Sequence, residues 1–249
     1  RPRCAIETAQ SLRVDAGSVG EGSQRRAAPP PATVMASPAH DAPILYVLAG
    51  VNGAGKSSIG GAALRQQGSA YFNPDEVAQR IRSELECSVE EANALAWQEG
   101  KRRLDEAIES RADYAFESTL GGNTIPGLLA QAADEGFQVV VWFAGLSSAG
   151  QHIARVRERV AAGGHDIPEA KIRERWETSR RNLIALLPHL SELRIFDNSR
   201  EAAAGRIPEP VLLLHWRGGK IIAPSRRGLE LTPEWAKPII ARALQLHRL

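Results

Sequence analysis

Residues 50–57 read Gly50-Val51-Asn52-Gly53-Ala54-Gly55-Lys56-Ser57 and match the pattern G-x-x-x-x-G-K-[ST]. In proteins that bind nucleoside triphosphates, the backbone amides of such a loop wrap the phosphates. An apolar, β-favouring run precedes it at 44–49, and a helix-compatible stretch follows it at 57–67. Because strand, loop and helix succeed one another as the motif requires, the sequence predicts a phosphate-binding loop.

The side chains and glycines of this loop have distinct expected roles. Gly53 and Gly55 let the backbone come close to phosphate oxygens, and the new helix adds partial positive charge at its N-terminus. We expect Lys56 to reach the β- and γ-phosphates of ATP, and the Ser57 hydroxyl to bind Mg²⁺. The predicted nucleotide-binding residues are Asn52, Gly53, Ala54, Gly55, Lys56, Ser57 and Ser58. The alternative is a glycine-rich turn with an exposed lysine.

Length and composition favour a single α/β core. The chain has 249 residues, a formal net charge of +2 and no basic stripe interleaved with aromatic residues, so nucleic acid is not an expected partner. Its two cysteines, Cys4 and Cys87, do not predict a disulfide framework. No apolar run approaches the roughly 20 residues that span a bilayer. We therefore expect a soluble, cytoplasmic protein without membrane contacts.

The first 41 residues differ from the rest of the chain. They are rich in Arg, Ala, Ser, Gly and Pro and lack apolar periodicity, which predicts a disordered tail at 1–41 and one domain at 42–249. The single methionine, Met35, lies shortly before the first predicted strand. One hypothesis is that the tail is translated upstream sequence with no structural role. Mass spectrometry of the native N-terminus would reject this by finding residues before Met35.

Short apolar runs alternate with long polar segments of helical period. After the first strand these runs lie at 70–72, 114–116, 138–143 and 193–196. The alternation predicts parallel βαβ units, and hence a doubly wound parallel sheet with helices on both faces. Runs at 211–216 and 220–223 flank Arg217-Gly218-Gly219 and predict an added hairpin. A closing helix is expected from about Thr232, with a kink at Pro238 inside it.

A polar segment, Asn73-Pro74-Asp75-Glu76, directly follows the second predicted strand. Asn73 suits an N-cap, Pro74 the first helical position and Glu76 a capping box. Asp75 is not needed for helix initiation and would lie at the carboxyl end of a parallel strand, where open α/β sheets bind ligands. We predict that Asp75 orients a substrate hydroxyl toward the γ-phosphorus of ATP. The alternative is a first-turn aspartate favoured by the helix dipole.

Three more polar side chains, Glu117, Ser118 and Thr119, follow the third predicted strand and precede Gly121-Gly122. They should emerge at the same sheet edge as the phosphate loop, where they could bind the phosphoryl acceptor. Their alternative use is to cap the helix that begins near Asn123, although Asn123 could do so itself.

The segment at about 150–178 predicts a lid made of two helices. Arg155 and Arg159 lie four residues apart on the first helix, Gly163-Gly164 forms a hinge, and Arg175 lies on the second. Arginines closed over the transferring phosphate would stabilise its developing charge and exclude water. The ordinary alternative is an exposed arginine-rich helix paired with glutamates.

Two further polar residues have open roles. Asn198 follows the last predicted parallel strand, where it could shape the adenine pocket or serve the turn. His165, beside the glycine hinge, could help to bind phosphate or act as a hinge residue. No second His or Cys stands at metal-ligand spacing, so a zinc site is not expected.

Together these motifs resemble the zeta toxin family of P-loop kinases, over about residues 44–200, and most closely its short Gram-negative type. The segments that carry the likeness are Gly53–Ser58, Asn73–Asp75, Glu117–Leu120, the lid from Arg155 to Pro168, Ile172–Trp176, Ser179, Asn182–Leu183 and Asp197–Ser199.

The resemblance implies an ATP-dependent kinase that phosphorylates the sugar 3′-hydroxyl of UDP-N-acetylglucosamine and is neutralised by an antitoxin protein. It also implies that Asp75 is the base and that Glu117 and Thr119 contact the acceptor sugar. Lys56 would clamp the phosphates together with two lid arginines. Of the candidates Arg155, Arg159, Arg173 and Arg175, we choose Arg159 and Arg175.

Two other classes of function stay open at this point. One is a P-loop kinase for another small molecule, such as an antibiotic, or for polynucleotide ends, without a toxin role. The other is a nucleotide-dependent switch or regulatory ATPase. A GTP switch would need an Asn-Lys-x-Asp motif, which the sequence lacks.

Overall fold

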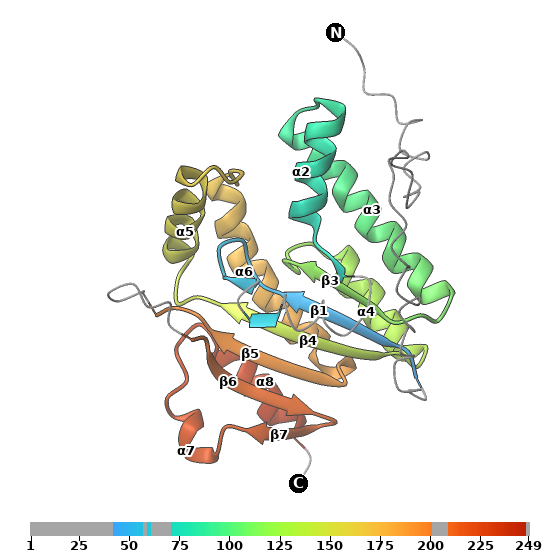
Figure 1. The fold of residues 1–249 in the computed structure, drawn as a ribbon. Coiled ribbons are helices and arrows are strands. Elements are labelled where there is room, and N and C mark those ends of the chain that lie inside the picture. The colour runs from blue at the N-terminus through green and yellow to red at the C-terminus, as the bar shows by residue number, and fades with distance from the viewer. Residues whose placement is uncertain (1–41, 57–58, 61–70, 201–208, 248–249) are drawn as a thin grey trace, which may run out of the picture.

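The computed structural model describes residues 42–56, 59–60, 71–200 and 209–247. Within these ranges seven strands form one sheet in the order β2-β3-β1-β4-β5-β6-β7 (Figure 1). The strands are β1 (Ile44–Ala49), β2 (Tyr71–Phe72), β3 (Tyr114–Ser118), β4 (Gln138–Gly145), β5 (Glu192–Asp197), β6 (Val211–Arg217) and β7 (Lys220–Ala223). Strands β1 to β5 are parallel, and β6 and β7 form an antiparallel hairpin at one edge. The predicted sheet and hairpin are confirmed.

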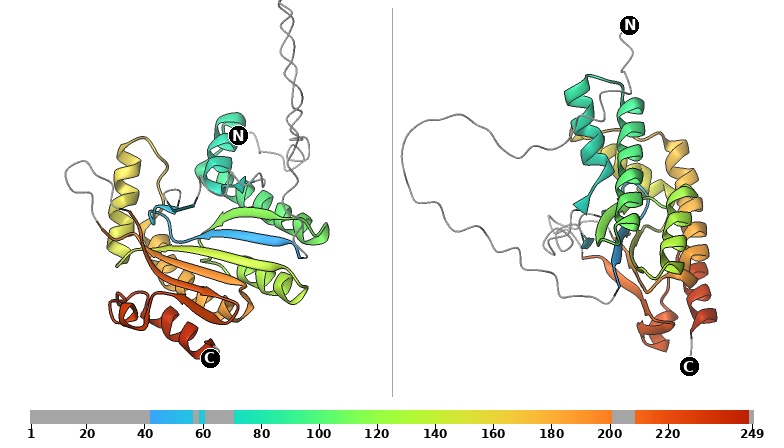
Figure 2. Two further views of the ribbon diagram at one scale, coloured as in Figure 1. Left: turned by 60° about the horizontal axis from the view of Figure 1, so that its bottom comes forward. Right: turned by 90° about the vertical axis from the view of Figure 1, so that its right-hand side faces the viewer.

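The helices connect and cover these strands. They are α2 (Pro74–Leu85), α3 (Val89–Glu109), α4 (Thr124–Asp134), α5 (Ala149–Ala161), α6 (Glu169–Leu186), α7 (Arg226–Leu229) and α8 (Lys237–Leu246), with a 3-10 turn, η3 (Leu187–His189). Figure 2 shows α4, α6 and α8 as one layer on a single face of the sheet. Figure 1 shows α2 and α5 standing on either side of the carboxyl ends of the strands.

Successive side chains of the central strands point to opposite faces of the sheet, so the core lies on both faces. Leu45 and Val47 of β1, with Val141 of β4, are at most 1% exposed and belong to the core under the α4, α6 and α8 layer. On the opposite face, a Cβ added at Gly60 would lie 2.7 Å from the ring of Trp142. The period of two thus buries both faces of the sheet, as parallel sheets require.

Strand β1 lies at the point where the strand order reverses, with β3 on one side and β4 on the other. In open α/β sheets, ligands bind outside the carboxyl ends of the strands at such a switch point. The loop at residues 50–56 leaves β1 at this position. The topology therefore places the predicted phosphate loop where a ligand site is expected.

The start of α2 follows the predicted capping chemistry in part. The Asn73 side chain accepts a hydrogen bond from the Asp75 amide at 3.0 Å, and Pro74 occupies the first turn. Glu76 accepts from the Asn73 side-chain amide at 3.2 Å. A full capping box forms instead at α3, where Ser88 and Glu91 exchange hydrogen bonds with each other's backbone amides.

The closing helix differs from its prediction. Helix α8 begins at Lys237, not near Thr232, and Pro238 lies in its first turn. A first-turn proline needs no hydrogen bond for its missing N–H, so no kink arises from it. The Thr232 hydroxyl donates to the Leu229 carbonyl at 2.7 Å and belongs to the preceding turn.

Four predictions fall partly or wholly on residues that the structure does not describe. The tail at 1–41, the metal-binding role of Ser57 and the nucleotide contact of Ser58 lie outside the described residues, as does most of the helix predicted at 57–67. Of the helices that the described ranges contain, none is both long enough and apolar enough to cross a membrane.

Candidate active site

The loop after β1 adopts a backbone that requires glycine. Gly53 and Gly55 have φ angles of +82° and +78°, in the left-handed region that residues with a Cβ rarely adopt. A Cβ at Gly53 would also lie 2.7 Å from the His152 carbonyl oxygen of α5. Glycine thus allows both the turn and the close approach of α5, and the binding of phosphate oxygens by this loop stays a prediction.

Three side chains from distant elements hold this loop in place. His152 Nδ1 lies 2.9 Å from the Asn52 carbonyl oxygen, and Asn198 donates to the Ala54 carbonyl at 2.9 Å. Arg175 of α6 donates to the Asn52 side-chain oxygen at 2.7 Å. Asn198 therefore braces the phosphate loop, and its predicted adenine contact stays a prediction.

His152 is a site residue that the sequence analysis missed. It is 1% exposed, and burial lowers its pKa to about 4, with Lys56 and Arg155 acting in the same direction and the hydrogen bond to Asn52 opposing them. A neutral imidazole can donate from Nδ1 to the Asn52 carbonyl, which fixes its tautomer. A lone histidine inside an amphipathic helix carries no sequence signal for such a contact.

This buried histidine predicts a pH dependence of stability. Between the unfolded pKa of about 6.5 and the folded value of about 4, the unfolded chain binds a proton that the folded chain does not, so stability falls as the pH drops through this window. The full shift corresponds to about 3 kcal/mol. The variant His152→Asn should lack this contribution to the pH dependence of the unfolding free energy. The free energy of unfolding in urea from pH 7 to 4 would measure it, and equal slopes in both proteins would contradict the assignment.

Lys56 is paired with a buried carboxylate. Its Nζ donates to the Gly50 carbonyl at 3.2 Å and lies 3.7 Å from Glu117 Oε2. Glu117 is 8% exposed and also accepts from the Tyr71 hydroxyl at 2.5 Å and from the Asn73 amide at 3.3 Å. The parallel register between β1 and β3 brings this carboxylate beside the phosphate loop.

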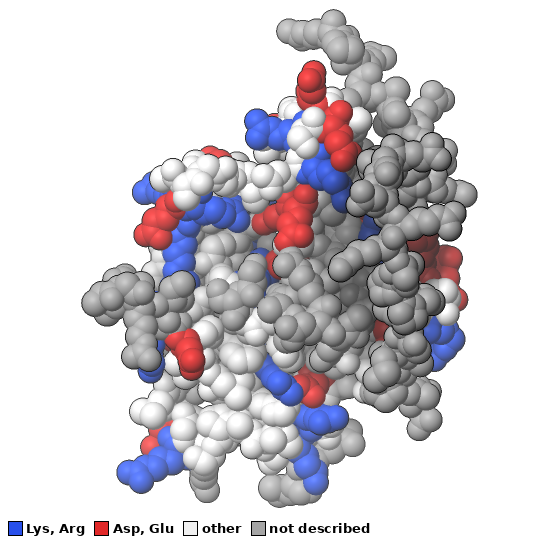
Figure 3. All heavy atoms as spheres, viewed as in Figure 1, with Lys and Arg blue, Asp and Glu red and all other residues white. Residues whose placement is uncertain are grey.

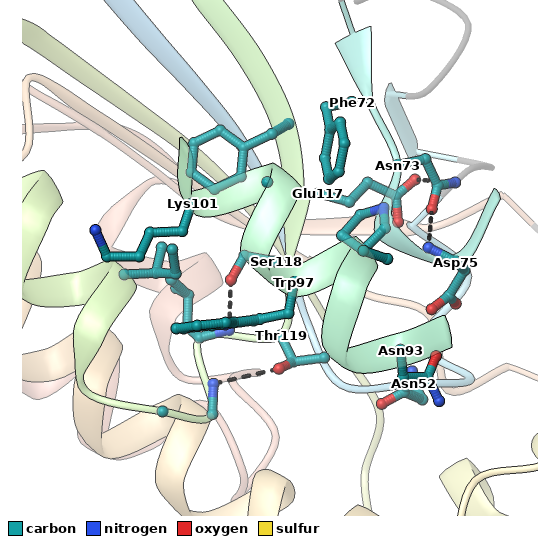
Figure 4. Close-up of a pocket in the computed structure, with 18 of the residues that line it drawn as sticks. Asn52, Phe72, Asn73, Asp75, Asn93, Trp97, Lys101, Glu117, Ser118 and Thr119 are labelled. Carbon is teal, nitrogen blue, oxygen red and sulfur yellow. Dashed lines mark hydrogen bonds between the residues drawn. The ribbon is translucent and has the colours of Figure 1, made fainter. Parts of the chain in front are cut away.

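Ser118 and Thr119 lie in the same cavity but shape their own loop. Their hydroxyls accept from the backbone amides of Leu120 at 3.0 Å and Gly121 at 3.3 Å (Figure 4). Helix α4 begins after Asn123, whose side chain makes no capping hydrogen bond. The two hydroxyls thus stabilise the turn, and their predicted contact with the acceptor stays a prediction.

Helix α6 fixes that loop from outside. The Ser179 hydroxyl donates to the Thr119 carbonyl oxygen, and Asn182 donates to the carbonyls of Leu120 at 2.7 Å and Gly122 at 3.0 Å. A Cβ at Gly121 would lie 2.8 Å from Arg175 Cγ. These contacts hold α6, the second helix of the predicted lid, against the loop after β3.

Asp75 faces the predicted lid. Its carboxylate lies 3.6 Å from Arg159 Nη1 and 3.6 Å from His165 Nε2, while Arg159 donates to the His165 carbonyl at 3.0 Å. Burial lowers the pKa of His165, and Asp75 opposes that shift. Burial also lowers the pKa of the Arg175 guanidinium, again against Asp75. Of the two arginines chosen as the phosphate clamp, Arg159 therefore contacts Asp75, and Arg175 lines the same cavity as Asp75.

The other two lid arginines lie elsewhere. Arg155 donates to the carbonyls of Asn198 at 2.6 Å and Arg200 at 3.2 Å. Arg173 is exposed and lies 4.0 Å from Glu169. Arg155 thus ties α5 to the segment after β5, and Arg173 follows the ordinary pattern of a surface ion pair.

A cavity of about 260 Å³ lies between Asp75 and the phosphate loop. Lys56, Glu117 and Arg175 line it with Asp75. The long helix α3 contributes Asn93, Trp97 and Lys101, which the sequence analysis did not single out (Figure 4). Their spacing of four residues was readable in the sequence, but nothing there showed which element α3 would face.

Charged side chains of both signs share one face of the molecule. On the face shown in Figure 3, the Lys and Arg side chains alternate with Asp and Glu side chains over the described residues. A nucleic-acid interface typically gathers Lys and Arg on one face. The described part of this face has no such gathering.

Comparisons with known proteins place this chain in a family. A family model described as "Zeta toxin" matches residues 32–204. A protein of Haemophilus influenzae, described as uncharacterized, is 28% identical over 133 residues, which are 51% of this chain and 88% of that protein.

Solved structures share the fold at low sequence identity. A structure from the PezAT chromosomal toxin-antitoxin system of Streptococcus pneumoniae is 14% identical with a TM-score of 0.53, and the match covers 86% of this chain and 91% of that one. The AvrRxo1-ORF1:AvrRxo1-ORF2 complex with ATP is 19% identical with a TM-score of 0.54, and the match covers 81% of this chain and 64% of that one.

Proposed function

Because this chain belongs to the zeta toxin family of ATP-dependent P-loop kinases, we propose that it transfers the γ-phosphoryl group of ATP to a hydroxyl of a nucleotide sugar. UDP-N-acetylglucosamine is the proposed acceptor. The observation that carries the proposal is one cavity whose wall includes the phosphate-loop lysine, Lys56, and a carboxylate from the first turn of α2 after β2, Asp75. A switch or regulatory ATPase does not need an acceptor cavity at this position.

Asp75 is the proposed general base. The acceptor hydroxyl donates a hydrogen bond to its carboxylate, and the hydroxyl oxygen attacks the γ-phosphorus of ATP. A new P–O bond forms, the bond from the γ-phosphorus to the β,γ-bridging oxygen breaks, and the hydroxyl proton passes to Asp75. The products are the phosphorylated sugar and ADP. A positioned base of this kind contributes about 10²- to 10⁴-fold to the rate.

Lys56, Arg159 and Arg175 supply the positive charge. In the structure their partners are Glu117, Asp75 and Asn52, respectively. ATP phosphates would compete for these groups, so Lys56 moves from Glu117 to the β- and γ-phosphates. Release of Arg159 would at the same time free Asp75 to accept the substrate hydroxyl.

Mg²⁺ is the proposed metal ion, and its proposed protein ligand, Ser57, lies outside the described residues. Among the described residues no three His, Cys, Asp or Glu side chains form a metal cluster. Magnesium in phosphate sites needs only one or two protein oxygens, because water and the phosphates supply the rest. Ser57 would provide the hydroxyl ligand. The bound ion would neutralise charge on the phosphate oxygens.

The proposal is tested by incubating the purified protein with ATP, Mg²⁺ and a panel of UDP-sugars. Phosphate transfer, followed by mass, should add one phosphoryl group to UDP-N-acetylglucosamine. Transfer to a different alcohol would keep the kinase and replace the acceptor. If ATP is hydrolysed without transfer to any alcohol, the regulatory ATPase becomes the better function.

An antitoxin is the proposed protein partner. The structural relative from Streptococcus pneumoniae is described as part of a toxin-antitoxin system. A small adjacent gene that encodes a helical protein would support a toxin role for this chain. Co-expression should then relieve growth arrest caused by this protein, and growth that is unaffected by its expression would contradict the toxin role.

A further inference from the structure

One wall of the cavity comes from a helix that carries neither the phosphate loop nor the proposed base. Asn93, Trp97 and Lys101 of α3 line the cavity together with Ala96 and Gly100. Residues three and four apart share one face of a helix. Figure 4 shows Lys101, Trp97 and Asn93 in succession along this helix. The cavity wall is therefore a continuous stripe of α3, which we name the α3 wall.

Trp97 is the large side chain of this wall and is not packed into the core. It is 49% exposed, whereas Trp216 and Trp235 are 4% and 3% exposed. Helix α3 buries other residues, including Leu104 at 0%. A tryptophan whose ring borders a cavity offers a large, rigid apolar surface with little conformational entropy to lose on binding. Such a side chain is suited to contact a ligand.

Close packing of α3 sets the position of that ring. A Cβ at Gly100 would lie 2.8 Å from the Phe72 ring of β2, so any other residue there would require the ring or the helix to shift. Gly100 lies one turn after Trp97. The glycine lets α3 approach the sheet, and this approach brings the indole to the cavity that also contains Asp75 and Glu117.

The polar neighbours of Trp97 restrict the chemistry of the ligand further. Lys101 forms an ion pair with Asp105 at 2.6 Å, and both side chains are about one-third exposed, so the ammonium group can also meet an anion from the cavity. Asn93 offers an amide to hydroxyl groups. Aromatic faces, a cation and an amide side by side suit an anionic molecule that contains a ring.

We propose that Trp97 determines acceptor specificity by stacking its indole on a ring of an anionic acceptor. The inference rests on the proposed kinase function and assigns the side of the cavity that holds the acceptor. Either a sugar or a nucleobase presents a face of this kind. Acceptors with a hydroxyl and a phosphate but no ring would lose this contact and bind weakly.

The kinetic test compares Trp97→Ala and Trp97→Phe with the wild type. The alanine variant should raise KM for UDP-N-acetylglucosamine by about 10- to 100-fold, the range of one lost aromatic stack, and leave KM for ATP unchanged. The Trp97→Phe variant should keep the KM for the acceptor close to the wild-type value, because its ring can still stack. Leu244→Ala on α8 is the matched control, because Leu244 is 48% exposed and lies outside the cavity. An unchanged KM for the acceptor in Trp97→Ala would overturn the inference.

A binding test separates this inference from the proposed function. UDP-N-acetylglucosamine, UDP and N-acetylglucosamine 1-phosphate are titrated while tryptophan emission is recorded, with glycerol 3-phosphate as the ring-free probe. Quenching by the first probe that disappears in Trp97→Phe supports the inference, and the two fragments show whether base or sugar makes the stack. Quenching that persists in Trp97→Phe, equal quenching by glycerol 3-phosphate, or none from any probe overturns it.

The two proposals can fail independently. Ring-dependent quenching through Trp97 without phosphate transfer would refute the kinase function and keep the α3 wall as a ring-binding surface. Phosphate transfer with a wild-type acceptor KM in Trp97→Ala would keep the kinase function and remove Trp97 from acceptor recognition.

Discussion

Replacing Asp75→Asn is expected to lower kcat for phosphoryl transfer by about 10²- to 10⁴-fold, the contribution of a positioned general base. The amide keeps the shape of the carboxylate but cannot take the proton from the acceptor hydroxyl. ATP binding should stay close to the wild-type value, because the phosphate loop, Lys56 and Arg175 are unchanged. The measurements are kcat with a UDP-sugar acceptor and the Kd for ATP.

The same variant distinguishes the catalytic role of Asp75 from a purely structural role in helix α2. An aspartate in the first turn of α2 also interacts with the helix dipole, an effect of about 0.3 to 1 kcal/mol on stability. Glu76→Gln removes a second carboxylate from the same turn and is the matched control, since Glu76 does not line the cavity. Wild-type kcat in Asp75→Asn would show that Asp75 only stabilises the helix.

The second large effect is expected at the phosphate loop. Lys56→Ala should lower kcat by about 10²- to 10³-fold, as loss of one preorganised electrostatic donor does, and should also weaken ATP binding. We expect both kcat and the affinity for ATP to fall, because Lys56 would contact the phosphates before and during transfer. Asp75→Asn, in contrast, affects the chemical step alone.

Lys56→Ala also leaves Glu117 without its ion-pair partner, so stability must be measured beside activity. Glu117 keeps hydrogen bonds from Tyr71 and Asn73, and the double variant Lys56→Ala with Glu117→Gln removes the uncompensated charge. Lys237→Ala, an exposed lysine paired with Glu234, is the control for loss of a lysine. If the double variant bound ATP like the wild type, Lys56 would not be a phosphate ligand.

Local patterns in the sequence carried much of the fold. The strand, loop and helix order around residues 50–56 has a strong local signature, because glycine adopts the positive φ angles found at Gly53 and Gly55 without strain. The runs that became β3 and β4 were readable for a similar reason, since buried parallel strands are continuous and apolar. The start of α8 was placed too early, because a turn near Thr232 and a helix share the same polar residues.

Some of the site residues could likewise be predicted from local sequence patterns, and others could not. Asp75 follows β2 and Glu117 lies near the end of β3, and both strands end at the same sheet edge, so the presence of both carboxylates in one cavity with Lys56 could be inferred from strand ends alone. Among the lid arginines, spacing could not separate Arg155 from Arg159, because both lie on one helix. Their different partners, Asn198 and Asp75, come from other elements.

The roles of His152 and Trp97 depend on contacts between distant segments, which no local sequence pattern predicts. His152 contacts Asn52, 100 positions away in the sequence, and is kept neutral by burial that exists only once α5 packs on the phosphate loop. Trp97 borders the cavity because Gly100 lets α3 approach Phe72. Backbone conformation and strand ends are set by neighbours along the chain, so the phosphate loop and the acidic residues at the strand ends could be predicted from the sequence. Burial, pairing and cavity walls arise from packing between distant segments, so they emerged only when the folded chain brought those segments together.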